Sequence, residues 1–106
     1  MNAFITGSRA YGCPTAESDV DLVVRVDKAT ADNLIRLSDN GKIPVRFGTL
    51  NLILCTTDEE YATWMLGTKH LSQQKGFVDK KDAKVTFDQL REIFDLKCDG
   101  YTQGDA

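Results

Sequence analysis

The stretch from Thr6 to Val24, which reads TGSRAYGCPTAESDVDLVV, decides the fold of this chain. A short run of strand-favouring residues at 3–6 leads into it and stops at the Gly-Ser pair. Residues 20–26 are apolar almost throughout, which is typical of a buried strand, but the start of this run is acidic. The glycines, proline and small polar residues between the two runs predict a loop with one helical turn near residues 9–11.

The residues that follow predict a helix and two more strands. Residues 29–38 have apolar positions at helical spacing and end at Asn40-Gly41, a pair typical of a helix stop. Residues 43–47 and 50–55 are expected to be strands, and the Gly48-Thr49 break between them allows a hairpin.

The next segment predicts a helix that begins after Thr57. Thr57 and Glu60 form a capping-box pattern, in which each side chain can bond a backbone N–H at the helix start. Aromatic and apolar residues then recur on one helical stripe, which we expect to pack in the core. The stripe consists of Tyr61, Trp64, Met65, Thr68 and Leu71.

The C-terminal third predicts a long loop and a last helix. Residues 72–84 are polar and rich in lysine, which favours a functional or mobile loop. Thr86 and Gln89 form a second capping-box pattern, with Val85 and Leu90 as its hydrophobic staple. The helix that they would open buries Phe87, Leu90, Ile93 and Phe94.

Length and pattern together predict one small domain. The chain has 106 residues, which suits a single core spanning residues 1–98, with an aperiodic tail at 99–106. We expect an α/β (α+β) fold with about four strands and three helices, and we find no internal repeat.

Composition limits the possible functions. The 13 basic and 16 acidic residues give a net charge of −3, so no strong positive field is present for non-specific binding to nucleic acid. The three cysteines are widely spaced and form no Cys-x-x-Cys pair, which favours a reducing compartment. The sequence shows no apolar stretch of membrane-spanning length and no signal-peptide pattern, so we expect a cytoplasmic protein with no membrane partner.

Candidate chemistry lies at both ends of the opening stretch. A strand that ends in Gly7-Ser8 and turns into a helix presents backbone N–H groups and a hydroxyl that can hold a phosphate. Asp19 and Asp21 share one face of the next strand, where two carboxylates can hold Mg²⁺. A phosphate cradle beside a metal-binding pair suits phosphoryl or nucleotidyl transfer. Taken singly, both motifs also occur as ordinary turn sequences.

Together these residues resemble a known signature. Gly7-Ser8, ten intervening residues and then Asp19-Val20-Asp21 between apolar flanks are similar to the motif of the DNA polymerase β-like nucleotidyltransferase superfamily. The likeness is greatest to its minimal members, some of them phage-encoded. The resemblance implies a minimal nucleotidyltransferase fold with a small mixed sheet. It also implies nucleotide phosphates at Gly7 and Ser8, and Mg²⁺ at Asp19 and Asp21.

One position departs from the family pattern. A third catalytic carboxylate is expected on a neighbouring strand, where this chain has Asn51. An amide oxygen can bind Mg²⁺, but it carries no charge and takes no proton from an acceptor hydroxyl. Arg9 has two interpretations, since it can bind the nucleotide's phosphates or form a surface ion pair. The single histidine, His70, is more often a helix-terminal residue than a general base.

The resemblance implies a magnesium-dependent enzyme. It would transfer a nucleoside monophosphate from an NTP, with ATP favoured, to a hydroxyl of a protein, a small molecule or a nucleic acid. The alternative is a non-catalytic nucleotide-binding or protein-binding module, antitoxin-like or a phage regulatory protein, which Asn51 favours. Larger family members bind the acceptor with extra domains, so we expect this short chain to use a second copy or a partner protein.

Overall fold

The computed structural model describes residues 2–75 and 80–97, and its four strands form one mixed sheet. The strand order is β1-β2-β4-β3, with β1 antiparallel to β2, β2 parallel to β4, and β3 antiparallel to β4. The strands are β1 (Asn2–Thr6), β2 (Val20–Arg25), β3 (Val45–Phe47) and β4 (Leu50–Cys55).

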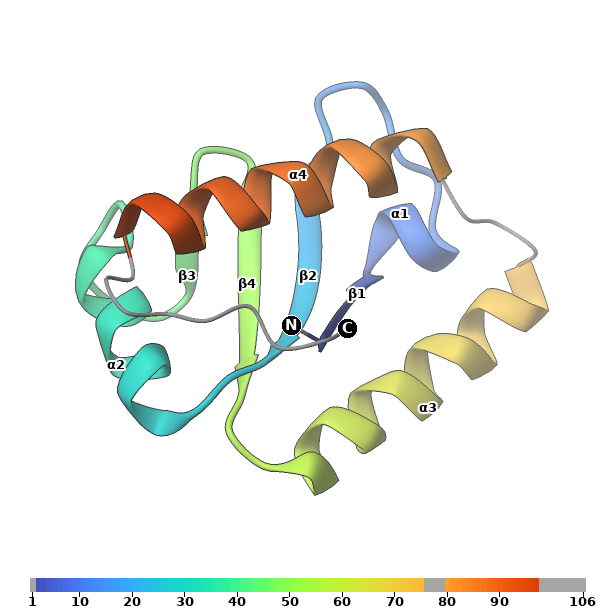
Figure 1. Ribbon diagram of the computed structural model, residues 1–106. Coiled ribbons are helices and arrows are strands. Elements are labelled where there is room, and N and C mark those ends of the chain that lie inside the picture. The colour runs from blue at the N-terminus through green and yellow to red at the C-terminus, as the bar shows by residue number, and fades with distance from the viewer. Residues whose placement is uncertain (1, 76–79, 98–106) are drawn as a thin grey trace.

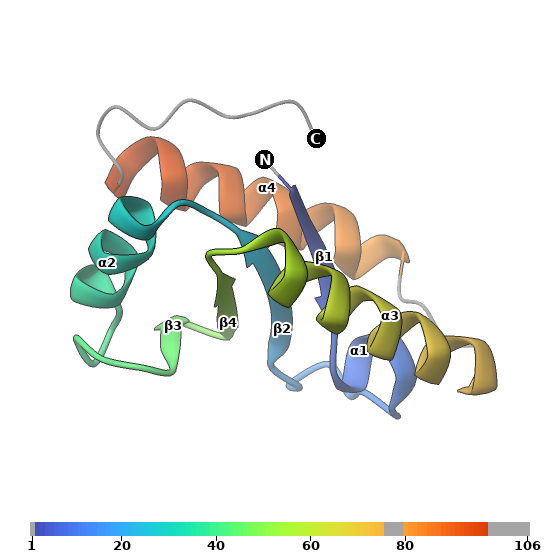
Figure 2. The same cartoon turned by 90° about the horizontal axis from the view of Figure 1, so that it is seen from below.

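In the described residues, four helices accompany the sheet, and three of them are long. They are α1 (Ser8–Tyr11), α2 (Lys28–Leu37), α3 (Asp58–Lys75) and α4 (Lys80–Lys97). Helix α4 crosses one face of the sheet, whereas α3 runs beneath the other face beside β1 and α1 (Figures 1 and 2). This arrangement confirms the expected α/β class with a small mixed sheet. No helix in residues 2–75 and 80–97 is long and apolar enough to cross a membrane.

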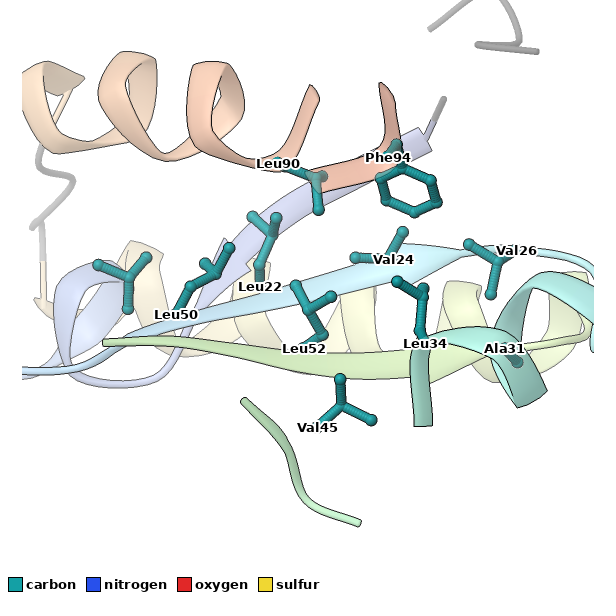
Figure 3. Packing of buried hydrophobic residues seen from close by; sticks show 11 residues of the cluster. Leu22, Val24, Val26, Ala31, Leu34, Val45, Leu50, Leu52, Leu90 and Phe94 are labelled. Atoms are coloured by element: carbon teal, nitrogen blue, oxygen red, sulfur yellow. The ribbon is translucent and has the colours of Figure 1, made fainter. Parts of the chain in front are cut away.

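The main core lies between the sheet and α4. Leu22 and Val24 of β2 project toward Leu90 and Phe94 of α4, and all four side chains are fully buried (Figure 3). Burying one such side chain stabilises the fold by about 1.5–3 kcal/mol. Since side chains alternate along a strand, Asp21 and Val23 must project from the opposite face. The core therefore dictates which face of β2 carries Asp21, whereas Asp19, which was expected on the same strand, lies just before its first residue.

Local sequence signals explain the helix and hairpin that were expected in the middle of the chain. Asp27 caps α2 by accepting a hydrogen bond of 2.7 Å from the Thr30 amide, and its bonding to Thr30 lowers the pKa of Asp27. Gly41 follows α2 with a φ of 68°, a left-handed conformation that suits glycine. Phe47 pairs with Leu50, which confirms the antiparallel hairpin, although β3 begins only at Val45.

The expected loop at residues 72–84 is wrong where the structure describes it. Helix α3 continues to Lys75, and α4 already begins at Lys80, so only residues 76–79 of this segment lie outside the described residues. Lysine and glutamine favour helices strongly, and a polar run can therefore be an exposed helix end. The tail at 99–106 also lies outside the described residues.

The second capping box is also wrong. Thr86 cannot cap α4, because the helix begins six residues earlier, at Lys80, and the Thr86 side chain is buried. The predicted burial of Leu90 and Phe94 is confirmed, since the 3.6-residue period holds wherever the helix starts.

Only part of the apolar stripe that was predicted for α3 packs against the sheet. The ring of Tyr61 packs edge-on against Phe4, and the Thr68 and Thr6 hydroxyls form a buried hydrogen bond of 2.6 Å. Trp64 and Met65 remain 43% and 41% exposed, so their expected place in the core is wrong. Helix α3 also lies against α1 and β2, and its Ser72 hydroxyl donates a hydrogen bond of 3.1 Å to the Ala10 carbonyl of α1.

The buried threonine pair predicts a measurable contribution to stability. Thr68→Val keeps the shape but leaves the Thr6 hydroxyl buried without its partner, which should lower the free energy of unfolding by about 1–3 kcal/mol. The double variant Thr6→Val/Thr68→Val should recover much of this loss. Urea unfolding measures both. Thr63→Val is the control, since the Thr63 hydroxyl bonds only within exposed α3. Equal effects at positions 63 and 68 would contradict the prediction.

Candidate functional site

One polar residue from each strand lies in a single row across the sheet. Thr6 pairs with Asp21, Asp21 pairs with Asn51, and Asn51 pairs with Arg46. Cross-strand partners project from the same face, so these four side chains lie on the face opposite the α4 core. Thr6 is buried under α3, whereas Arg46 at the other end is partly exposed. The row therefore runs from the interior toward solvent.

Asn51 of β4 lies beside Asp21 of β2, its partner in the parallel pairing of the two strands. Its Nδ2 donates a hydrogen bond of 2.9 Å to Oδ1 of Asp21. The Oδ1 atom of Asn51 is buried and has no hydrogen-bond partner in the described structure. A buried acceptor that lacks a partner is costly, and it marks a place where a donor or cation would be favourable.

Asp19 contacts Arg46, a residue for which we had predicted no role. Nη2 of Arg46 lies 3.0 Å from Oδ2 of Asp19, and the two side chains are 40% and 42% exposed. The amide of Arg46 donates to the Ser38 hydroxyl, and its carbonyl accepts from the Asp39 amide, both at 2.9 Å. The backbone of Arg46 is thus held in place while its side chain reaches across the sheet.

A sequence signal for Arg46 existed in the hairpin. A two-residue turn at Gly48-Thr49 pairs residue 47 with 50 and therefore residue 46 with 51. Because Asn51 was already a candidate, this register alone would have placed Arg46 next to it.

The Gly7-Ser8 turn lies directly against Asp21. Gly7 has φ 72° and ψ −152°, a combination that only glycine adopts readily. A Cβ atom on Gly7 would lie 2.3 Å from Oδ2 of Asp21, so a side chain there would displace the carboxylate. The Gly7 carbonyl accepts from the amides of Ala10 and Tyr11 at 3.0 Å and starts α1. The turn and the acidic strand are thus in close contact.

Arg9 lies in the interior, so the expected surface position is wrong. The residue is only 6% exposed. Its Nη2 donates to the carbonyl oxygens of Thr15 and Ser18, at 3.1 and 2.9 Å. Arg9 therefore holds the loop that leads into Asp19. A contact between Arg9 and nucleotide phosphates stays a prediction.

The donor set suits a hard divalent cation in its chemistry. Asp19 and Asp21 each keep one carboxylate oxygen without a hydrogen bond, and the Asn51 oxygen is a third acceptor without a partner. Oxygen ligands of this kind are those that Mg²⁺ prefers. Residues 2–75 and 80–97 contain no cluster of three or more His, Cys, Asp or Glu side chains that could hold a metal. Any cation here would depend on two carboxylates, an amide and substrate or water oxygens.

The other candidate groups lie outside the row. His70 is on an exposed position of α3, well within the helix rather than after it. Cys55 is fully buried at the end of β4, and burial raises the pKa of its thiol, which keeps it protonated and unreactive. Cys13 is exposed in the loop after α1. The row and the Gly7 turn therefore remain the best-formed polar site in the described part of the chain.

Comparison of the chain with protein-family models, with curated proteins and with solved structures found no match.

The close approach of Gly7 to Asp21 predicts a position-specific glycine requirement. Gly7→Ala should lower the free energy of unfolding by about 1–3 kcal/mol more than Gly48→Ala, measured by urea unfolding. Both glycines have positive φ, but a Cβ on Gly48 would meet nothing within 4 Å. The double variant Gly7→Ala/Asp21→Ala should recover the part of the loss that comes from the clash. Equal losses at positions 7 and 48 would show that Asp21 does not restrict Gly7.

Proposed function

We propose that this protein is a magnesium-dependent nucleotidyltransferase. The oxygen of an acceptor hydroxyl would attack the α-phosphorus of an NTP, and the bond from that phosphorus to the β-phosphate oxygen would break. The acceptor then carries the nucleoside monophosphate, and pyrophosphate leaves. ATP is the favoured donor.

The contact between the Gly7 turn and Asp21 carries this proposal. Phosphate binding at a backbone needs a residue with no side chain in the way, and Gly7 at the start of α1 has none, while the Asp21 carboxylate occupies the place of its Cβ. Metal-assisted transfer needs carboxylates beside that turn, and Oδ2 of Asp21 lies where a Gly7 side chain would be. The two requirements meet at one place, as the resemblance of residues 7–21 implies.

Each residue has a role that follows from its chemistry. When bound, Mg²⁺ would neutralise phosphate charge and polarise the attacked phosphorus. Asp19 and Asp21 would hold the cation, and the first-turn amides after Gly7 would bind phosphate oxygens. Asn51 accepts no proton, so the proton of the acceptor hydroxyl would pass to Asp21 or to water. Transfer should therefore be slow compared with a site that has three carboxylates.

The acceptor surface would include more than this chain. The acceptor hydroxyl can belong to a protein, a small molecule or a nucleic acid, and the overall charge of −3 disfavours non-specific nucleic-acid binding. The exposed Trp64 and Met65 on α3 are apolar surface that a second copy or a partner protein could cover. Oligomerisation and a cytoplasmic location are parts of the proposal.

A non-catalytic binding module is the second candidate. One observation favours it: both carboxylates already have partners within the chain. Asp21 accepts a hydrogen bond from Asn51, and Asp19 forms an ion pair with Arg46. Each carboxylate of such a site has a partner without a metal. The same residues could then bind a nucleotide or a protein without transferring anything.

The first test measures ATP affinity by calorimetry with and without Mg²⁺. The cation should tighten binding to the wild type, and Asp21→Asn should remove this enhancement, because the variant lacks the charge that the cation would bridge to phosphate. Asp32→Asn is the matched control, since Asp32 is an exposed acidic residue of α2 whose loss should change nothing. Binding that is independent of Mg²⁺ in both proteins would contradict the proposed metal site.

The second test restores the family carboxylate with Asn51→Asp, which changes almost no volume. It should tighten Mg²⁺ binding and raise the transfer of label from α-labelled ATP, since it adds a charge and a base. It should also lower stability without metal, because Asp21 loses its amide donor and gains a like charge. Efficient wild-type transfer that falls in Asn51→Asp would show that the third ligand lies elsewhere. Absence of ATP binding in both would favour the non-catalytic module.

A further inference from the structure

Arg46 places a positive charge where the proposed enzyme would bind its cation. Within the described residues, the guanidinium bonds Oδ2 of Asp19, while the backbone is held by Ser38 and Asp39. Asn51 pairs with Asp21 on one side and with Arg46 on the other, so Arg46 is two strands away from Asp21. The arginine thus belongs to the carboxylate site by position as well as by charge.

A guanidinium and a divalent cation compete for Asp19. Magnesium binds oxygens at about 2.0–2.1 Å, and a cation shared by Asp19 and Asp21 would lie within a few ångströms of the Arg46 charge. The repulsion between the two cations makes occupation of both positions unfavourable. Since only the side chain of Arg46 is free to move, it is the part that would leave.

We propose that Arg46 is a built-in counter-ion of Asp19 that a divalent cation displaces, and that the displaced guanidinium then binds nucleotide phosphate. This inference rests on the proposed function and adds to it a residue that the sequence motif does not include. The arginine neutralises Asp19 while the site is empty and becomes a phosphate ligand when the site fills.

The chemistry of arginine supports both positions. Its planar fork of N–H donors matches carboxylate and phosphate equally, and it stays charged at all relevant pH values. The ion pair with Asp19 is 40% exposed on the arginine side, so breaking it costs little, as for other surface ion pairs. A rotation of the side chain is sufficient, because the β3–β4 pairing holds the backbone in place.

The test compares two ligands on Arg46→Gln, which keeps a polar side chain but carries no charge. Mn²⁺ alone, followed by electron paramagnetic resonance, should bind about three- to tenfold more tightly, because its competitor is gone. Inorganic tripolyphosphate with Mg²⁺, followed by calorimetry, should bind about three- to tenfold more weakly, because a phosphate ligand is gone. Arg46→Lys should retain most of the competition with Mn²⁺ but lose part of the phosphate affinity.

The opposite signs distinguish this role from a purely structural one, which would weaken both ligands. Arg91→Gln is the matched control, since Arg91 forms an Arg–Asp ion pair of similar exposure on α4 and should affect neither ligand. Unchanged or weaker Mn²⁺ binding in Arg46→Gln, or undiminished tripolyphosphate binding, would overturn the inference. If both expected shifts in affinity are observed but the protein transfers nothing from ATP, the proposed enzyme is contradicted and the role of Arg46 is still supported.

Discussion

The alternation of side chains along β2 is the constraint on which both the core and the site depend. Leu22 and Val24 must meet α4, and this requirement turns Asp21 toward the opposite face. The parallel pairing of β2 with β4 then sets Asn51 beside Asp21. A slip of one residue would bury Asn51 in the apolar core, so the energy of the core also fixes the geometry of the polar row.

The negative charges of Asp19 and Asp21 are partly compensated within the chain. Asp19 and Asp21 are like charges two residues apart, an arrangement that costs stability unless other groups compensate it. Arg46 compensates the first with charge, and the Asn51 amide compensates the second with a hydrogen bond. Both carboxylates therefore have a partner from a different strand of the sheet.

Much of this fold could be predicted from the sequence, because its signals are local. The strand before Gly7, the acidic strand from Val20 and the hairpin around Gly48 are each set by short-range alternation and turn chemistry. The expected loop at 72–84 was wrong because a polar helix end and a polar loop have similar compositions. The exposure of Trp64 depends on how α3 lies under β1, which no periodicity can specify. To predict that Arg46 lies at the site, the register of the hairpin has to be combined with the candidate role of Asn51.

Asn51 links the stability of this site to its chemistry. A carboxylate at position 51 would stand beside Asp21 as a third negative charge and would need a cation to be tolerated. An amide donates to Asp21 instead, so it stabilises the row without a ligand but provides no base for an acceptor hydroxyl. The Gly7 turn is needed in either case, because Asp21 fills the space of a side chain there. The Gly-Ser motif is therefore compatible with both proposals, a nucleotidyltransferase and a non-catalytic binding module. The two proposals differ in what they require at position 51, which pairs with Arg46 and here carries an uncharged amide.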